Sequence, residues 1–435
     1  MGRTYHDPLH GAIALDHRDP TEALLIRLID TPAFQRLRRV RQLGPASLTF
    51  HGAEGSRFTH SLGVMAIARR AFDQIAKQYP QLLPHRSIAL CAALLHDIGH
   101  GPFSHTSEEV FGYNHEAWTR RIIRESGPIR QLLDSVHPQL VDGIEQVYLK
   151  KYPLPLVWQL VSSQLDCDRL DYLMRDSYFT GTSYGRLDLD RILIALNYDP
   201  VSQQLVVARK GMAAIEHYLI VRNLMYSQVY NHPKNIAASW VLEQAFRRAR
   251  EQLLVGQLEA DATMTVWLQQ TGERLEVQAA IKDKAAESTE TSMSLDCYLA
   301  ADDGVCTYHL QRWQSSSDQV LADLCRRFLD RDLFKALDVT DLDPPQQQKL
   351  LCGVYQLLQQ AGFMPQYYAG LRVALSRGYT LYQRGIKLQT ERGLQEISEL
   401  SPLVQTLIKP VQRPWLIYPR EIESGLLALH RSLSV

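Results

Sequence analysis

The chain has 435 residues, and its 47 lysines and arginines are balanced by 47 aspartates and glutamates. This length suits two or three domains whose cores need no disulfide or structural metal. A formal net charge of zero gives no overall field that would attract nucleic acid or a membrane surface. An anionic ligand would therefore need a local group of cations.

The six cysteines are scattered, and none of them forms a CxxC pair. A disulfide framework or a thiolate zinc site is therefore not expected, and a reducing compartment fits best. The first residues lack the apolar core of a signal peptide, and no apolar run approaches the roughly 18 residues of a membrane span. We therefore expect a cytoplasmic protein without a membrane partner.

The first half of the chain has the apolar period of helices packed around a core. Apolar side chains three and four positions apart predict one buried helix face, made of Leu62, Met65, Ala68, Phe72 and Ile75. Residues 88–95 are apolar on all sides, which predicts a central helix that ends near Gly99 as its cap. Further long helices are expected over 158–174 and 212–228, with a short strand pair within 197–209.

The second half begins with a polar run at 282–294, which is typical of a loop or linker. Residues 320–337 are again helical by pattern, and from 378 onward β-prone segments at 379–382 and 415–418 alternate with helical ones. We therefore predict a mainly α protein. It would have a helical catalytic domain over 1–250, a helical extension with a linker over 251–335, and a smaller mixed α/β region over 336–435.

Spaced histidines and aspartates form the strongest chemical signal. His60 lies in RFTHSLGV, His96 and Asp97 are adjacent in LLHDIGHGPFSH, and Asp168 lies in QLDCDRLDYLMRD. Neutral imidazole with carboxylate suits a divalent transition metal such as Mn, Fe, Zn or Ni. Such an ion lowers the pKa of bound water and polarises phosphate oxygens. The pattern therefore predicts a metal-dependent hydrolytic site.

Two further features surround these positions. A lone histidine is usually a surface or core residue, but His96, His100, His105 and His115 fall within one stretch of twenty. On the helix predicted from residue 168, one face carries the polar side chains of Asp168, Tyr172, Arg175 and Asp176. Alone, that face would be a solvated surface. Together with the clustered imidazoles, it predicts a binding site for an anion.

These residues lie in longer blocks that resemble the HD-domain phosphohydrolase superfamily, and within it the deoxynucleoside triphosphate (dNTP) triphosphohydrolase branch. The blocks, which run from about Asp7 to Lys234, are DPLHGAIAL, IDTPAFQRLRRVRQLG, RFTHSLGV, LLHDIGHGPFSH, LDCDRLDYLMRD and VRNLMYSQVYNHPK. The bare HD motif is moderately specific, whereas the whole series in this order is highly specific. The resemblance implies hydrolysis at the α-phosphorus, which releases a deoxynucleoside and intact triphosphate.

The resemblance also implies a metal centre and its catalytic neighbours. The metal ligands would be His60, His96, Asp97 and Asp168, and Mg²⁺ would accompany the substrate phosphates. His105 would be the general acid that protonates the departing 5′-oxygen, with help from Glu116. His100 and His115 would line the phosphates beside it.

For the substrate, the resemblance places Gln42 and Leu43 against the deoxyribose. Tyr172 and Asp176 would hold the 3′-hydroxyl, and Tyr230 would stack near the sugar or base. Phosphate oxygens would be bound by Arg57, Arg169 and Arg222. The family has lysine where this chain has Arg169, which keeps the charge but changes its geometry. Asn231 replaces a family glutamine, and Pro233 follows nearby, so base preference stays open.

A member of the family is activated by nucleotides that bind between subunits and drive oligomer assembly. The matching positions here are Asp30, Gln35 and Arg38 for guanine, and Arg209, Lys210 and Lys234 for the neighbouring site. The resemblance thus implies a GTP or dNTP activator and a homo-oligomer, either a dimer or a tetramer. From the residues alone, IDTPAFQRLRR is equally well an amphipathic helix with exposed arginines.

Two other functions remain open. An HD enzyme with a different pocket would cleave another nucleotide or phosphodiester with the same metal centre. A non-catalytic nucleotide-sensing protein is less consistent with intact ligand positions. Nucleic-acid binding is also disfavoured, because the chain is neutral and its arginine-rich runs at 36–41 and 247–250 are short.

Overall fold

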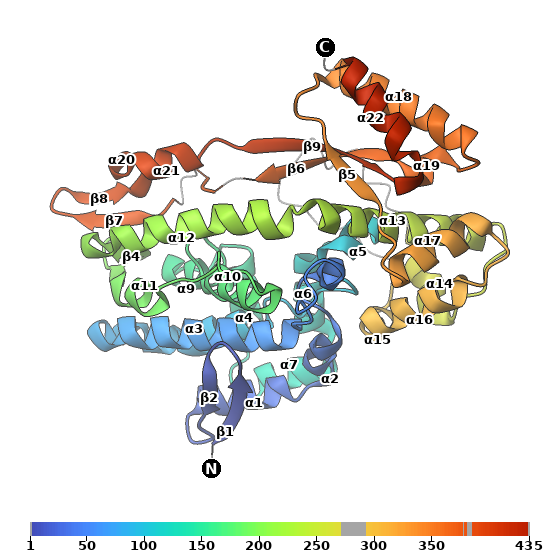
Figure 1. The fold of residues 1–435 in the computed structure, drawn as a ribbon. Helices are drawn as coiled ribbons and strands as arrows, with labels where there is room; N and C mark the ends of the chain where they lie inside the picture. The colour runs from blue at the N-terminus through green and yellow to red at the C-terminus, as the bar shows by residue number, and fades with distance from the viewer. Residues whose placement is uncertain (1, 271–292, 377, 381–384, 434–435) are drawn as a thin grey trace.

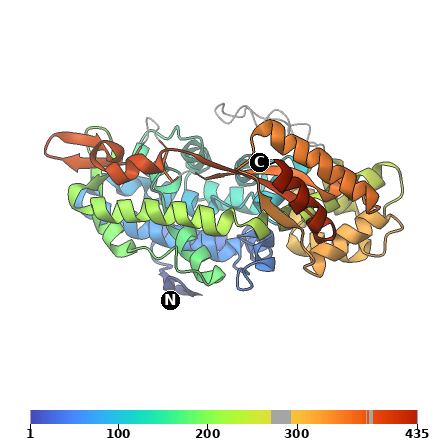
Figure 2. The same ribbon diagram turned by 45° about the horizontal axis from the view of Figure 1, so that its top comes forward.

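The computed structural model describes residues 2–270, 293–376, 378–380 and 385–433. Figure 1 shows a helical body with an N-terminal hairpin on one side and the C-terminal strands across the opposite side. The hairpin consists of β1 (Arg3–Asp7) and β2 (Gly11–Leu15). In the view of Figure 2, turned by 45°, the C-terminal helices lie at one end of the molecule.

The helices of the first half share one apolar core. Its centre is α4 (Arg86–Leu95), which packs against α3 (Arg57–Gln78), and α3 also contacts α10 (Cys167–Thr180). The predicted apolar face of α3 is buried throughout, which confirms its register. The other helices of this half are α1 (Pro20–Ile29), α2 (Pro32–Arg36), α5 (His105–Phe111), α6 (His115–Glu125), α7 (Gly127–Asp134), α8 (Leu140–Tyr148), α9 (Pro155–Val161), α11 (Leu189–Ala195), α12 (Met212–Met225) and α13 (Pro233–Leu254).

The second half adds helices around two small sheets. One sheet has the order β3 (Leu196–Asp199), β4 (Gln204–Ala208), β7 (Lys387–Thr390) and β8 (Gly393–Glu396). The other has the order β5 (Lys335–Asp338), β9 (Val411–Tyr418) and β6 (Gly370–Ser376). The helices are α14 (Ala262–Gln269), α15 (Leu295–Ala300), α16 (Asp303–Trp313), α17 (Gln319–Leu329), α18 (Pro344–Gln360), α19 (Pro365–Tyr368), α20 (Ile397–Leu400), α21 (Pro402–Leu407) and α22 (Glu423–Leu433).

The mainly α class is confirmed, and so are the strand pair β3–β4 and the strand at 415–418. β7 pairs in parallel with β4, so C-terminal strands extend a sheet that begins within the first 250 residues. Helix α13 continues across residue 250. The three-domain division stays a prediction. The predicted linker at 282–294 lies outside the described residues except for its last two positions.

The single helix expected over 158–174 is wrong, because α9 ends at Val161 and α10 begins at Cys167. The break has a local cause. The Asp166 carboxylate caps α10 by accepting from the Arg169 backbone N–H at 2.8 Å, and it also accepts from the Ser163 N–H at 2.7 Å. The new helix start puts Asp168 in the first turn of α10.

Three smaller expectations also fail. Gly99 is not a left-handed cap; a side chain there would meet the His115 carbonyl oxygen at 2.2 Å, so close packing requires the glycine. The helix expected over 320–337 ends at Leu329, and Arg331 has a φ of 59° before β5 begins. Residues 379 and 380 are not in a strand, and 381–382 lie outside the described residues.

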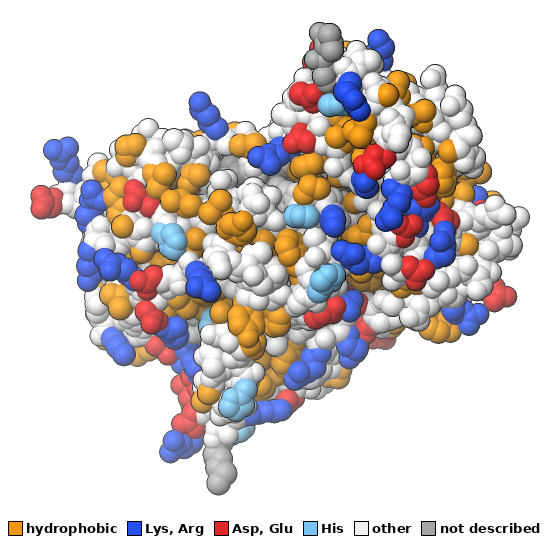
Figure 3. Space-filling view, viewed as in Figure 1, with side chains coloured by type: hydrophobic (Ala, Val, Ile, Leu, Met, Phe, Trp, Pro, Cys, Tyr) orange, Lys and Arg blue, Asp and Glu red, His pale blue; other side chains and the backbone are white. Residues whose placement is uncertain are grey.

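The face of the molecule in Figure 3 carries acidic and basic side chains interspersed with each other. Neither sign forms a continuous field on this face. Among the described residues, no helix has both the length and the apolar character needed to cross a membrane.

Candidate active site

Four predicted ligands meet where three helices converge. His60 is in the first turn of α3, His96 and Asp97 directly follow α4, and Asp168 is in the first turn of α10. The His60 Nε2 atom lies 3.1 Å from Asp168 Oδ1, 3.3 Å from His96 Nε2 and 3.6 Å from Asp97 Oδ2. His96 Nε2 lies 3.3 Å from Asp97 Oδ1 and 3.6 Å from Asp168 Oδ1. We call these four residues the ligand cluster.

The other ring nitrogen of each histidine is held by a fixed acceptor. His60 Nδ1 is 2.7 Å from Asp171 Oδ2, and His96 Nδ1 is 2.9 Å from the Ala93 carbonyl oxygen. A carbonyl or carboxylate oxygen accepts, so Nδ1 carries the proton in both rings. Each Nε2 atom therefore faces the centre of the cluster, where a metal ion would bind in place of a proton.

The charges of the cluster are arranged to keep its carboxylates ionised. Although burial raises the pKa of Asp97, the adjacent Arg57 guanidinium and histidines hold that pKa well below its usual range. Burial lowers the pKa of His60, but its bonds to Asp168 and Asp171 raise it to about 10. His60, His96 and Asp97 place donor atoms within 4.8 Å of one another. Asp168 Oδ1 lies 3.1 and 3.6 Å from the two histidine Nε2 atoms, so the four donors together fit a divalent metal.

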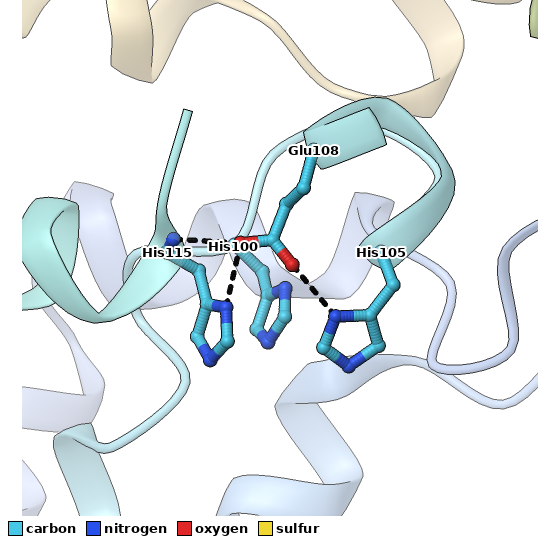
Figure 4. A group of neighbouring side chains, drawn as sticks. All are labelled: His100, His105, Glu108 and His115. Atoms are coloured by element: carbon cyan, nitrogen blue, oxygen red, sulfur yellow. Dashed lines mark hydrogen bonds and ion pairs between the residues drawn. The ribbon is translucent and has the colours of Figure 1, made fainter. Parts of the chain in front are cut away.

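A second group lies beside the ligand cluster and consists of His100, His105, His115 and Glu108; we call it the histidine group. Glu108 accepts from His105 Nδ1 through one oxygen and from His115 Nδ1 through the other, both at 2.7 Å. The rings of His100 and His115 stack with centroids 3.9 Å apart. Figure 4 shows all three rings pointing the same way from the Glu108 carboxylate. His100 Nε2 also lies 3.4 Å from Asp97 Oδ1, which links the two groups.

The environment divides the roles within the histidine group. The side chain of His105 is 68% exposed, whereas His100 is buried. Burial and the neighbouring Arg57 lower the pKa of His100 well below its usual range. Burial lowers the pKa of His115 as well, but the bond to Glu108 outweighs this and raises it. The surroundings thus favour the neutral form of His100 and the protonated form of His115.

Glu108 was not among the residues predicted from the sequence pattern. Glu116 is exposed at the start of α6, whereas Glu108 is the carboxylate that contacts both His105 and His115. The sequence did contain a local signal for the contact with His105. Glu108 follows His105 by three positions on one helix, and side chains at that spacing are neighbours. The pairing with His115 depends on how α5 and α6 meet, which spacing does not reveal. The role predicted for Glu116 stays a prediction.

The predicted phosphate residues lie nearby with incomplete partners. Arg169 bonds to Asp166, and Arg222 Nη1 donates to Gln164 Oε1 at 3.0 Å, yet the Nε atoms of both arginines are buried without a partner. Arg57 is satisfied differently, because it pairs with Asp97 and donates to Ser104 Oγ at 2.7 Å. Buried orphan donors are costly, so two of them beside one site indicate an anionic ligand.

The predicted sugar residues come together on α10 and at the end of α12. Tyr230 lies in a π-helical turn, Tyr226–Tyr230, and its hydroxyl donates to Asp176 Oδ2 at 2.9 Å. The rings of Tyr172 and Tyr230 are 6.0 Å apart, edge to face. Burial raises the pKa of Asp176 to about 7.

A cavity of about 320 Å³ opens beside the histidine group. Gln42, Leu43 and Tyr230 line it together with His105. Other parts of the wall come from residues 44–46, from the start of α5, from α13, and from β6, where Arg372 was not among the residues predicted from the sequence. The buried Gln42 Oε1 atom has no hydrogen-bond partner.

The positions matched to an activator site lie on the surface in two sets. Gln35 and Arg38 contact each other at 2.8 Å, and Asp30 pairs with Arg3 at 2.5 Å. The second set, all exposed, comprises Arg209, Lys210 and Lys234. The side chains of the first set contact neighbouring residues of the same chain. The role of both sets as nucleotide sites stays a prediction.

Comparison with known proteins agrees with this geometry. The HD domain family model matches residues 57–150, and the HD associated region matches 187–290. The uncharacterized protein YwfO of Bacillus subtilis is 36% identical over 430 residues, which cover 97% of this chain and 93% of that protein.

A crystal structure of a phosphohydrolase from Bacteroides thetaiotaomicron has a TM-score of 0.81 and 28% identity over 97% of this chain and 100% of its own. The deoxynucleoside triphosphate triphosphohydrolase SAMHD1 of Danio rerio is 27% identical over 286 residues. The matched residues cover 57% of this chain and 45% of the fish protein. HD domains bind divalent metals, and the ligand cluster offers donors for such an ion. This chain belongs to the HD-domain phosphohydrolase family and resembles its dNTP triphosphohydrolase branch.

Proposed function

We propose that the protein hydrolyses dNTPs to a deoxynucleoside and triphosphate, with a divalent transition metal in the ligand cluster. The observation that carries this proposal is the pair of buried, unpartnered Nε atoms on Arg169, which directly follows Asp168 on α10, and on Arg222 of α12, which packs against α10. A phosphate chain would supply acceptors to both donors. When bound, the metal supplies Lewis-acid chemistry, polarising a phosphate oxygen and lowering the pKa of water.

The protein residues bind and orient the substrate in this proposal. Arg169 and Arg222 hold phosphate oxygens, and His100 and His115 line the phosphate chain, which Mg²⁺ accompanies. Asp176 accepts the 3′-hydroxyl beside Tyr172 and Tyr230. Gln42 and Leu43 contact the sugar face in the 320 Å³ cavity, where a 2′-hydroxyl would be rejected. The support is that Gln42, Leu43 and Tyr230 line one cavity with His105, and that Tyr230 bonds to Asp176 and lies 6.0 Å from Tyr172.

His105 is the proton donor to the departing 5′-oxygen. The Glu108 carboxylate bonds to His105 Nδ1 at 2.7 Å, so the ring presents Nε2 to the open side of the site. The same carboxylate bonds to His115, so one group orients both rings. The exposed His105 side chain can collect a new proton from solvent after each turnover.

The direct test incubates metal-replete protein with each dNTP, singly and as an equal mixture, and separates the products by ion-pair chromatography. The proposal expects deoxynucleoside plus intact triphosphate, little turnover of ribonucleotides, and no turnover by the Asp97→Asn variant. Cleavage of a generic phosphodiester with no turnover of any dNTP would favour an HD enzyme for another substrate. Binding of dNTPs without any hydrolysis would favour a nucleotide sensor.

Activation by GTP or a dNTP, and assembly into a dimer or tetramer, are also part of the proposal. They are supported by the family matches at Asp30, Gln35 and Arg38, and at Arg209, Lys210 and Lys234. Light scattering with and without GTP tests assembly, and rates in single and mixed dNTPs test activation. A monomer whose rate ignores added nucleotides excludes both. A cytoplasmic location is proposed on the six scattered cysteines, none of which forms a CxxC pair.

A further inference from the structure

The N-terminal hairpin reaches the back of the ligand cluster. Asp7, at the end of β1, is buried, and its Oδ2 atom accepts from Arg175 Nη1 at 2.9 Å. Its Oδ1 atom accepts from the backbone N–H groups of Leu9 and His10, at 2.9 and 2.8 Å. The same carboxylate therefore shapes the turn of the DPLHG motif and contacts α10.

The turn delivers His10 to Asp171. His10 Nε2 lies 2.5 Å from Asp171 Oδ1, which also accepts from Arg175 Nη2 at 3.0 Å. Asp171 Oδ2 accepts from Arg175 Nε and from His60 Nδ1, both at 2.7 Å. Four bonds saturate the acceptor positions of one carboxylate, so the Asp171 side chain has no freedom to rotate.

Gly63 makes this close arrangement possible. It lies on α3 three positions after His60, where a Cβ atom would stand 2.0 Å from Asp171 Oδ1 and 2.5 Å from Arg175 Nη2. Even alanine would force one of these buried groups to move. The glycine of the THSLGV block is thus needed for the approach of α10 to α3, not for a turn.

We propose that Asp7, His10, Arg175 and Asp171 form a positioning relay through which the N-terminal hairpin holds the metal ligand His60 in its binding orientation. The relay fixes the proton on His60 Nδ1 and aims Nε2 at the other ligands. Outer partners of metal-bound histidines commonly change metal affinity by roughly 10- to 100-fold. This inference rests on the metal site of the proposed function, but not on the identity of the substrate.

The test measures Co²⁺ affinity of the full chain, after chelator treatment, by competition with a coloured chelator and by the visible bands of bound Co²⁺. Asp171→Asn should weaken Co²⁺ binding by roughly 10- to 100-fold and shift the bands, because the amide presents N–H groups to donors. Asp7→Asn and Gly63→Ala should weaken it in the same direction, Asp7→Asn by less. Asp16→Asn is the control, since that partly exposed carboxylate pairs locally with Arg18.

Thermal unfolding of each metal-free variant separates positioning from folding. The relay predicts that Co²⁺ raises the melting temperature of Asp7→Asn less than that of the wild type. Equal affinity and equal bands in wild type and Asp171→Asn overturn the relay, even if the metal-free variant is less stable. A wild-type chain that binds no Co²⁺ in the ligand cluster would instead overturn the proposed metal site itself.

Discussion

The ligand cluster and the neighbouring histidine group use histidine side chains in different ways. In the ligand cluster, His60 and His96 are held at Nδ1 by a buried carboxylate and a backbone carbonyl, and Nε2 points inward at other ligands. In the histidine group, a single carboxylate, Glu108, holds both His105 and His115, and the side chain of His105 is largely exposed.

Under the proposed function, the difference would separate the binding of an ion from the transfer of a proton. The side chains of the ligand cluster are held in place because α3, α4 and α10, which carry or directly precede them, pack together in the core. The histidine group sits at the start of α5 and α6, where His105 has access to solvent and to the cavity. Loss of a ligand should therefore remove metal and activity together, whereas loss of His105 should remove activity alone.

The largest effect is expected from Asp168→Ala, which removes one of the two carboxylates from the ligand cluster. Because the ion stabilises the transition state by several kcal/mol, dNTP hydrolysis should fall by roughly 10³-fold or more, together with bound metal. Metal content after purification and initial rates measure the two losses. Retention of both metal and rate would mean that Asp168 is not a ligand.

His105→Asn should give the next largest effect. The variant loses the proposed proton donor, so kcat should fall by roughly 10²- to 10⁴-fold while metal content stays at the wild-type level. His137→Asn, a change at an exposed histidine on the surface, is the matched control. A wild-type kcat in His105→Asn would assign the proton transfer to another group.

Glu108→Gln should have a smaller effect in the same region. Glutamine offers one acceptor where Glu108 uses both oxygens, so either His105 or His115 loses its bond. Losing a hydrogen bond of a charged group costs about 1.5–3 kcal/mol, or roughly a 10- to 100-fold lower kcat. The Glu116→Gln variant gives the comparison. If Glu116→Gln is the more damaging change, the original prediction for Glu116 is right and Glu108 is secondary.

The last expected effect is on stability and its dependence on pH, and it leaves the catalytic rate aside. Asp176 has a pKa of about 7 in the folded chain, above the value of about 3.9 in an unfolded one. Its contribution to stability is therefore full below about pH 4 and is lost as pH rises to 7, by up to about 1.4 kcal/mol per pH unit. Denaturant unfolding of the metal-free protein between pH 5 and 7 should show this slope, and Asp176→Asn should lack it. Parallel profiles for the two proteins would contradict the raised pKa.

Much of the site could be predicted from local pattern. The period of α3 and the apolar segment before His96 place His60, His96 and Asp97 at helix ends, because helices of that kind must bury their apolar faces. Asp168 was expected on a helix, but not in its first turn, since the break after Val161 depends on the Asp166 cap. Glu108, Asp171 and Asp7 were not selected as functional residues, because their partners lie on other elements.

The sequence by itself determined the helical class, the donor types of the ligand cluster and the density of histidines, because side-chain chemistry and periodicity are local properties. Only the tertiary structure decided that Asp7 from the hairpin stands behind His60, and that Arg372 from β6 lines the cavity beside His105. Those contacts join residues more than fifty positions apart. Such pairings depend on how the apolar surfaces of distant elements pack together, and this packing cannot be predicted from a short stretch of sequence.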